Sequence, residues 1–358
     1  MSGGDWIARS ARHEDRDFWC LGFRKGGVRT FGEATAMPGY SSETSLEQTY
    51  CVRDLLLALP SLDGTSTEDV ERALLGLELT PAVRFGAETA LARWAAQKQG
   101  LTLAEWWGAR PGSGAQCNGL VPKGLGAADA ARHAVGQRDA GVRCLKVKVS
   151  GTSSDIERLR AIAEAAPELS LRLDANAAWS AEQATEFLSS VSRYAFDYCE
   201  QPLAPDAMPP GSLGAPIALD ETLRHVAATS AWLGCETQAL TAYLSSQGPL
   251  PELTPHADLR ALVLKPTILG GTAICLRWAT LARACGLDVV FTHTFEGPLG
   301  LAACRAAALA AGVGHVPQGL ASYEALSAWS SMRESDFPIR FDGHSLRVAL
   351  GAADSARV

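Results

Sequence analysis

Three acidic residues stand at the ends of short apolar runs and are spaced by about one strand and one helix each. The runs LRLD, DYCE and IALD end in Asp174, Glu200 and Asp220. Because the carboxyl ends of parallel barrel strands open on one face, we expect these side chains to converge. Converging carboxylates repel each other unless a cation neutralises them, and an all-oxygen ligand set suits Mg²⁺, with Mn²⁺ as the alternative ion. The pattern therefore predicts a divalent-metal site.

Lysines stand at two further strand ends. In CLKVKVS, Lys146 and Lys148 are two residues apart, so on a strand their side chains share a face. A neighbouring ammonium lowers the pKa of a lysine and so lets it act as a base. We expect Lys148 to remove the α-proton of a metal-bound carboxylate with Lys146 in support; for the pair alone, a solvated face is the alternative. The run LVLK adds Lys265 at another strand end.

The order of apolar runs predicts the architecture that positions these residues. From about residue 114, short apolar runs alternate with alanine-rich helical stretches. This alternation predicts a parallel sheet covered by helices, and the number of repeats favours a (β/α) barrel. The earlier residues hold a turn-rich stretch, MPGYSSET, followed by helical segments. We expect an α+β domain over 1–113, a barrel over 114–320 and a C-terminal segment over 321–358.

Composition narrows the class of partner. The chain has 358 residues, 47% of them hydrophobic, a formal net charge of −7 and no basic run, which argues against nucleic acid and anionic membranes as partners. Apolar stretches fall short of the roughly 18 residues of a membrane span, and charges near the N-terminus argue against a signal peptide. Nine scattered cysteines without a CxxC pair argue against a disulfide framework or a zinc site. We expect a cytoplasmic protein with a small-molecule substrate.

The motifs around these residues resemble the enolase superfamily in its muconate-lactonising subgroup. They are KVK, LDAN, EQPL, LDET and LKPTILGG, which end at residues 148, 176, 203, 222 and 271. Within the subgroup, the similarity is to the o-succinylbenzoate synthase family. It is carried by GEATAMPGYSSET, FGAETALA, CNGLV, RLDANAAW and RALVLKPTILGG. The resemblance runs from about residue 30 to about residue 320.

The resemblance implies a (β/α)7β TIM-like barrel with an N-terminal α+β capping domain, on which the C-terminal segment packs. It implies a lyase, a hydro-lyase with Mg²⁺ on the three carboxylates. The reaction would be the syn dehydration of 2-succinyl-6-hydroxy-2,4-cyclohexadiene-1-carboxylate to o-succinylbenzoate in menaquinone biosynthesis. Lys148 would take the α-proton and return it to the departing hydroxide on the same face, while Lys265 stays protonated over the ring.

Further residues are candidates for contact with this substrate. Arg172 should share a strand face with Asp174, where it either orients the substrate or forms an ion pair within the barrel. Met37 and Tyr40 belong to the turn-rich stretch, which should close over the succinyl arm; they are either pocket walls or ordinary turn residues. Asn176 is expected beside the metal cluster.

The end of the last long strand supplies a second group of candidates. It reads FTHTFEGPLGL (291–301). The candidates there are Thr292, Thr294, Glu296 and Gly297. A helix beginning at Pro298 could hold the succinyl carboxylate on its free N–H groups. His293 either contacts the substrate or has a structural role.

Two other functions remain open. Racemisation of N-succinylamino acids would need Lys148 and Lys265 as bases on opposite faces, whereas dehydration on one face needs only Lys148. A catalytically inactive barrel that serves as a binding protein is the other alternative, although the complete set of lysines and carboxylates argues against it. The extra segment at 226–258 is expected to be an exposed insertion, which either contributes to an oligomer contact or shapes the pocket. The sequence does not indicate the oligomeric state.

Overall fold

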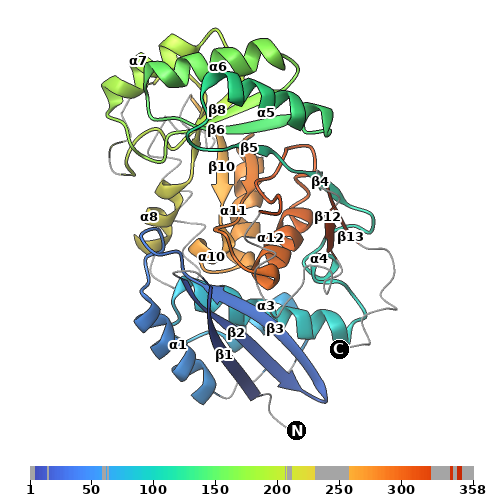
Figure 1. The fold of residues 1–358 in the computed structure, drawn as a ribbon. Coiled ribbons are helices and arrows are strands. Elements are labelled where there is room, and N and C mark those ends of the chain that lie inside the picture. Colours follow the sequence, from blue (N-terminus) through green and yellow to red (C-terminus); the bar gives the residue numbers. More distant parts are fainter. Residues whose placement is uncertain are drawn as a thin grey trace.

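The computed structural model places most of the chain. It describes residues 5–13, 16–58, 62, 64–205, 207, 212–229, 258–323, 339–341 and 345–348. Figure 1 shows an antiparallel sheet at the N-terminal end of the molecule and a larger curved parallel sheet beyond it. The insertion expected at 226–258 falls almost wholly outside the described residues.

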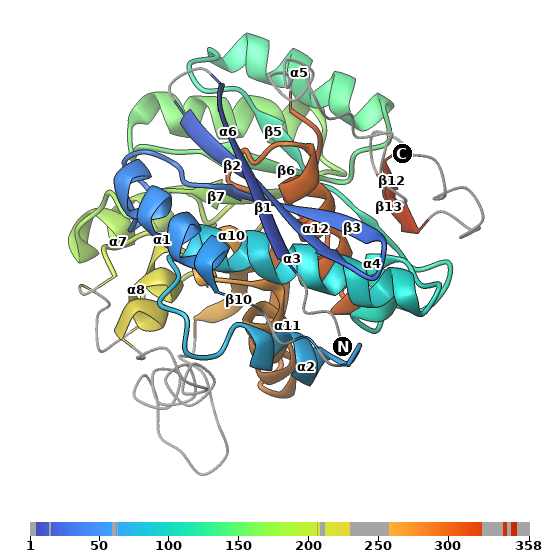
Figure 2. The ribbon, with the colours of Figure 1, turned by 90° about the horizontal axis from the view of Figure 1, so that it is seen from below.

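The N-terminal part packs helices against an antiparallel sheet in the order β1-β2-β3. Its strands are β1 (Asp5–His13), β2 (Arg16–Lys25) and β3 (Val28–Thr35). Its helices are α1 (Ser45–Leu57), α2 (Thr67–Ala73), α3 (Pro81–Lys98) and α4 (Leu103–Trp106). Gly32 lets α3 approach β3, because a Cβ there would lie 1.9 Å from the carbonyl oxygen of Gly86. Helix α3 also contacts the barrel helices α10 and α11, so it lies between the two parts (Figures 1 and 2).

Seven parallel strands form the larger sheet, in the order β11-β10-β9-β8-β7-β6-β5. They are β5 (Gly119–Val121), β6 (Cys144–Lys148), β7 (Ser170–Asp174), β8 (Phe196–Glu200), β9 (Ile217–Leu219), β10 (Leu259–Leu264) and β11 (Asp288–Phe291). The helices that follow them are α5 (Ala127–Asp139), α6 (Ser153–Ala165), α7 (Ala181–Val191), α8 (Glu221–Thr229), α10 (Pro266–Leu269), α11 (Thr272–Ala284) and α12 (Pro298–Ala310). The alternation differs from the expectation once, since the described residues between β8 and β9 form no helix.

A two-residue segment closes the sheet into a barrel. The N–H of Gln318 donates to the carbonyl of Gln116 at 2.7 Å, and the carbonyl of Gln318 accepts from the N–H of Asn118 at 2.9 Å. The N–H of Gly319 donates to the carbonyl of Phe291, at the end of β11, at 2.8 Å. This segment therefore joins the two edges of the seven-stranded sheet as the eighth strand. The expected (β/α)7β barrel with its N-terminal α+β capping domain is confirmed.

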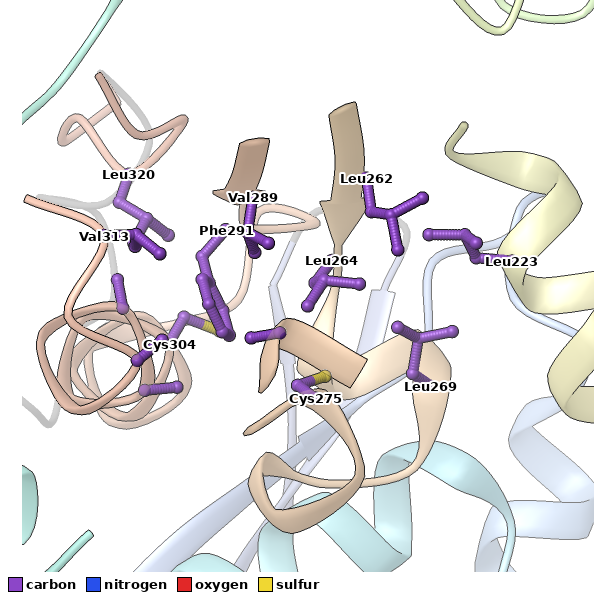
Figure 3. Packing of buried hydrophobic residues seen from close by; sticks show 14 of the residues in the cluster. Leu223, Leu262, Leu264, Leu269, Cys275, Val289, Phe291, Cys304, Val313 and Leu320 are labelled. Carbon is purple, nitrogen blue, oxygen red and sulfur yellow. The ribbon is translucent and has the colours of Figure 1, made fainter. Parts of the chain in front are cut away.

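Alternate residues of each barrel strand face opposite sides, as the period of a strand requires. One buried cluster comes from residues that include Tyr198, Ala261 and Val263, and it is separate from the main core. The intervening Leu262 and Leu264 belong to the main core between the strands and the helices (Figure 3). Buried free cysteines, among them those at positions 275 and 304 in Figure 3, pack there as small apolar side chains, as expected.

The last described strands lie beside the start of the barrel. Strands β12 (Ile339–Phe341) and β13 (Ser345–Val348) form a hairpin, and β13 pairs with β4 (Gly114–Gln116). The domain limits at residues 113 and 320, and the packing of the C-terminal segment on the capping domain, stay predictions.

Among the helices that the structure describes, none has both the length and the apolar character needed to cross a bilayer.

Candidate active site

The barrel strands bring the three predicted carboxylates to one end of the sheet. Asp174 and Glu200 are the last residues of β7 and β8 and are direct partners in the strand register. Lys148 pairs with Asp174 in the same register on the other side, and Asp220 follows β9 directly. All three carboxylates are buried, with 2%, 2% and 4% of Asp174, Glu200 and Asp220 exposed. Burial of charged groups is costly, so each of them needs a cationic partner.

Lys146 neutralises two of these carboxylates. Its Nζ lies 3.0 Å from Oδ2 of Asp174 and 2.7 Å from Oε1 of Glu200. Burial tends to lower the pKa of Lys146, but Asp174, Glu200 and Asp220 outweigh this and raise it well above its ordinary value. Burial, helped by the two neighbouring aspartates, raises the pKa of Glu200 to about 8 despite the attraction of Lys146. Lys146 is therefore a fixed cation within the cluster.

Lys148 has a different environment, although it lies on the same strand face. Its side chain is 42% exposed, and its Nζ lies 3.6 Å from Oδ2 of Asp174. The Nζ donates to Oδ1 of Asn176 at 2.7 Å, and the N–H of Asn176 donates to Oδ1 of Asp174 at 3.1 Å. Asn176 adopts φ +48°, a left-handed conformation that asparagine tolerates better than most residues. Asn176 thus holds an accessible Lys148 beside the carboxylates.

Lys265 meets Asp220 and Tyr40 on the opposite side of the cluster. Its Nζ donates to both Oδ2 of Asp220 and the hydroxyl of Tyr40, and only 12% of its side chain is exposed. The hydroxyl of Tyr40 in turn donates to Oδ1 of Asp220 at 3.0 Å. Burial and the negative charge of Asp220 raise the pKa of Tyr40, so the phenol stays protonated. The Lys265 ammonium also lies 4.4 Å from the centre of the Tyr40 ring.

Arg224 connects the turn that carries Tyr40 to the barrel. The turn is closed by donation from the N–H groups of Tyr40 and Ser41 to the carbonyl of Met37, at 3.0 and 2.8 Å. Arg224, on α8, donates to the carbonyl of Tyr40, and its guanidinium lies 5.3 Å from the centre of the Tyr40 ring. Arg224 therefore holds Tyr40 over Asp220, while Met37 is partly buried within the turn.

Comparison with known proteins identifies the family. Residues 129–241 match the family model described as Enolase C-terminal domain-like. The chain is 30% identical over 261 residues to the o-succinylbenzoate synthase of Thermobifida fusca (strain YX), covering 70% of this chain and 72% of that protein. It is 31% identical over 283 residues to the o-succinylbenzoate synthase of Pasteurella multocida (strain Pm70), covering 76% and 71%. The chain belongs to the enolase superfamily.

A solved structure superposes on this chain over nearly its whole length. The dipeptide epimerase from Methylococcus capsulatus, crystallised in complex with a Mg ion, superposes with a TM-score of 0.72 at 22% identity, covering 97% of each chain. The resemblance read from the motifs is confirmed, and the protein is a member of an enzyme family. At this identity the likeness shows the fold alone.

The residues at the strand ends can be tested against the divalent cation that an enolase-superfamily fold implies. Among the described residues, no three Asp, Glu, His or Cys side chains enclose a metal position as they stand. The Nζ atoms of Lys146 and Lys265 lie against the carboxylates instead. The donors are nevertheless hard oxygens. Oε2 of Glu221, next to Asp220, is buried without a hydrogen-bond partner, and burial raises the pKa of Glu221 to about 7. These observations fit a site that gains stability from a further cation once Lys265 releases Asp220.

The threonines near the end of β11 already donate hydrogen bonds. Buried Glu296 accepts from the hydroxyls of Thr267 and Thr294 at 2.6 Å each, and from the N–H of Thr294 at 2.7 Å. The hydroxyl of Thr292 donates to the carbonyl of Gly319, in the closing strand, at 3.0 Å. In this enolase-superfamily member, Glu296 ties the end of β11 to the segment after Lys265; a contact with substrate stays a prediction for these residues.

Two glutamates of the capping domain occupy the N-termini of barrel helices. Glu33, on β3, accepts from the N–H of Gly297 at 2.6 Å and from that of Gly300 at 3.0 Å. Glu88, on α3, accepts from the N–H of Thr272 at the start of α11. The positive end of each helix dipole stabilises the negative charge of the carboxylate beside it. The N–H groups of Gly297 and Gly300 are therefore already bound by Glu33 of the chain itself, and binding of a substrate carboxylate at this helix N-terminus stays a prediction that these contacts do not favour.

The contacts of Arg172 lie within the barrel, on the side away from the strand ends. Its Nη1 donates to the carbonyl of Pro317 at 2.6 Å, and its Nε lies 3.3 Å from Oδ2 of Asp197, near the start of β8. The guanidinium also lies 5.1 Å from the centre of the Tyr198 ring. These contacts favour the ion pair within the barrel over a role in orienting the substrate.

His293 belongs to a small aromatic cluster. Its ring stacks on Tyr323 with a centroid distance of 5.2 Å, and its Nδ1 accepts from the N–H of Phe295 at 3.1 Å. Burial lowers the pKa of His293 to about 4, so its imidazole is neutral at pH 7. These contacts favour a structural role for His293 over contact with the substrate.

Several residues of the site were not expected. Arg224 lies one helical turn after Asp220, a position at which a basic side chain can reach back over the strand ends, so a local signal existed. Gln201 stands in the EQPL motif, but nothing in the motif shows which groups its side chain meets. Glu33 contacts Gly297, 264 residues later, and local sequence carries no signal for such a pair.

Proposed function

We propose that this protein is an o-succinylbenzoate synthase, which dehydrates 2-succinyl-6-hydroxy-2,4-cyclohexadiene-1-carboxylate in menaquinone biosynthesis. The observation that carries the proposal is the unequal environment of its lysines. Lys148 is accessible, whereas Lys265 is bound to Asp220 and Tyr40. Dehydration with both departures on one face needs only one base. The names of the curated relatives support the same activity.

Asp174, Glu200 and Asp220 would hold Mg²⁺. When bound, the ion supplies Lewis-acid chemistry, which acidifies the α-proton of a carboxylate substrate and stabilises the negative charge that develops. Lys146 keeps Asp174 and Glu200 together by its ion pairs at 3.0 and 2.7 Å.

Lys148 would do the proton transfers. Its neutral amine takes the α-proton as the carbon–hydrogen bond breaks, and the resulting ammonium returns that proton to the hydroxyl group as the carbon–oxygen bond breaks. One water leaves and the ring becomes aromatic. Lys265, at the strand end on the other side of the carboxylates, would stabilise negative charge there. Tyr40 and its turn would exclude water from the site.

Racemisation of N-succinylamino acids is the second candidate. It requires Lys265 to exchange protons with the substrate from the face opposite Lys148. The Nζ of Lys265 instead donates to the carboxylate of Asp220 and to the phenol of Tyr40. The observation that favours this candidate is that Lys148 and Lys265 each lie beside a carboxylate, Asp174 and Asp220 respectively. A binding protein without catalysis is disfavoured by the accessible Lys148 beside three buried carboxylates.

The test compares both reactions in one preparation. We expect the purified protein with Mg²⁺ to convert the cyclohexadiene acid to o-succinylbenzoate, followed by the ultraviolet absorbance of the aromatic product. Incubation of N-succinylamino acids in D₂O, followed by mass spectrometry, should show slower exchange of the α-proton. Rapid exchange with an untouched cyclohexadiene acid would replace the proposal with racemisation. If neither reaction occurs with Mg²⁺ present, the result would favour a binding protein without catalysis.

A further inference from the structure

Gln201 follows Glu200 directly and has an unusual backbone conformation. Its φ is +39°, in the left-handed region that residues other than glycine seldom adopt, and its side chain is fully buried. Such a conformation costs energy and persists only where the surroundings impose it. The contacts of Gln201 show what imposes it.

The backbone of Gln201 joins the strand ends on both sides. Its N–H donates to the carbonyl of Ala218, on β9, at 2.8 Å. Its carbonyl accepts from the N–H of Ala177, three residues after Asp174, at 2.7 Å. Gln201 thus links β8 to the segments that carry the other two carboxylates, Asp174 and Asp220.

The side chain of Gln201 adds a second set of links, all directed at the segment around Asp220. Its Oε1 accepts from the N–H groups of Asp220 and Thr222, at 3.0 Å each. Its Nε2 donates to the hydroxyl of Thr222 at 2.8 Å and to the carbonyl of Leu203 at 2.7 Å. The amide therefore uses two acceptor and two donor positions, which is its full capacity.

We propose that Gln201 is a positioning residue that sets the spacing of Asp174, Glu200 and Asp220 for the divalent cation. The inference rests on the proposed function, because it assumes that these carboxylates hold Mg²⁺. Only a primary amide of this length satisfies the four partners. Glutamate lacks the donors, and an apolar side chain leaves the buried N–H groups of Asp220 and Thr222 without an acceptor. Asp220 could then turn away from Glu200.

The test measures Mg²⁺ affinity by isothermal titration calorimetry on the metal-free protein. We expect Gln201→Met, which keeps the unbranched side chain, to weaken binding by about 10- to 100-fold, the usual effect of losing a partner that orients a metal ligand. The matched control is Gln318→Met. Gln318 is equally buried, and its amide accepts from the N–H of Phe291 at 2.7 Å and donates to the carbonyl of Val316 at 2.7 Å. It lies in the closing strand, so we expect lower thermal stability but unchanged Mg²⁺ affinity.

The outcomes separate this inference from the proposed function. If the wild-type protein binds no Mg²⁺, the metal-dependent function fails and the inference fails with it. If the wild type binds Mg²⁺ and Gln201→Met binds it equally tightly, the inference alone is overturned. Equal weakening in both variants would also overturn it, because the effect would then follow from general loss of stability. If Gln201→Met does not fold, Gln201→Leu takes its place; failure of both to fold while Gln318→Met folds would assign Gln201 a structural role only.

Discussion

The hydroxyl of Tyr40 donates a hydrogen bond to the carboxylate of Asp220 at 3.0 Å, although the two residues are 180 positions apart in the chain. Tyr40 belongs to the capping domain and Asp220 to the barrel. The contact means that the capping loop reaches one of the three carboxylates directly. The position of the loop and the geometry of the strand ends are therefore coupled.

Replacement of Tyr40 by phenylalanine tests this coupling. The ring keeps its contacts with Lys265 and Arg224, but Asp220 loses a donor and Lys265 an acceptor. A hydrogen bond to a charged group contributes about 1.5–3 kcal/mol, so we expect kcat/KM for the cyclohexadiene acid to fall by roughly 10- to 100-fold. Steady-state kinetics at saturating Mg²⁺ measure this. Tyr50→Phe, at an exposed position on α1, should leave kcat/KM unchanged; a normal Tyr40→Phe enzyme would contradict the coupling.

Loss of the accessible lysine should stop catalysis without loss of structure. A general acid or base contributes about 10²- to 10⁴-fold, so we expect Lys148→Ala to reduce kcat by that factor. Because Lys146 still joins Asp174 and Glu200, Mg²⁺ affinity and thermal stability should change little. Product formation and calorimetry measure the two quantities. Lys98→Ala, at the end of α3, is the control; retained activity in Lys148→Ala would assign the proton transfer to another group.

Lys146 should matter for stability as well as for function. Lys146→Met leaves Asp174 and Glu200 buried without their shared cation, and breaking a buried ion pair costs about 3–5 kcal/mol. We expect urea unfolding in EDTA to show this loss. Added Mg²⁺ should restore part of it, because a ligand that binds only the folded state stabilises that state. If Mg²⁺ stabilises the wild type and the variant equally, the ion does not replace the missing charge.

Glu88 predicts a pH dependence of stability. Burial raises its pKa from 4.5 to about 7. Between those values the folded state holds a proton that the unfolded state has released, so the free energy of unfolding falls as pH rises. The stabilisation is complete below pH 4.5 and is lost as pH rises through about 7, a difference on the order of 3 kcal/mol. Glu88→Gln should lack this component when unfolding is followed by urea titration at several pH values; identical slopes for variant and wild type would exclude Glu88 as its source.

The strand ends were predictable because their positions follow from topology. A run such as LRLD fixes where a strand stops, and parallel pairing then brings Asp174 beside Glu200. The depth of a side chain was not predictable in the same way. Lys146 and Lys148 share one face, but Lys146 lies one step deeper, between two carboxylates, whereas Lys148 reaches the open end.

Contacts between distant segments lay beyond local reasoning. The turn around Tyr40 is predicted to close over the substrate, but nothing near it in the sequence shows that Arg224 binds its carbonyl. The Gly-Pro pair that opens α12 predicts a helix N-terminus with free donors. The acceptor, Glu33, comes from a strand of the other domain, so only the folded structure shows that the donors are taken.

At the interface between the capping domain and the barrel, the capping domain supplies the acceptors, Glu33 and Glu88, and the barrel supplies the N–H donors. A barrel produced without its capping domain would lose the acceptors at the N-termini of α11 and α12, and the capping domain alone would carry two acidic side chains without these donors. The halves are thus mutually dependent rather than modular. Removing either glutamate would take the acceptor away from the helix N-terminus that it binds, in the other part of the molecule.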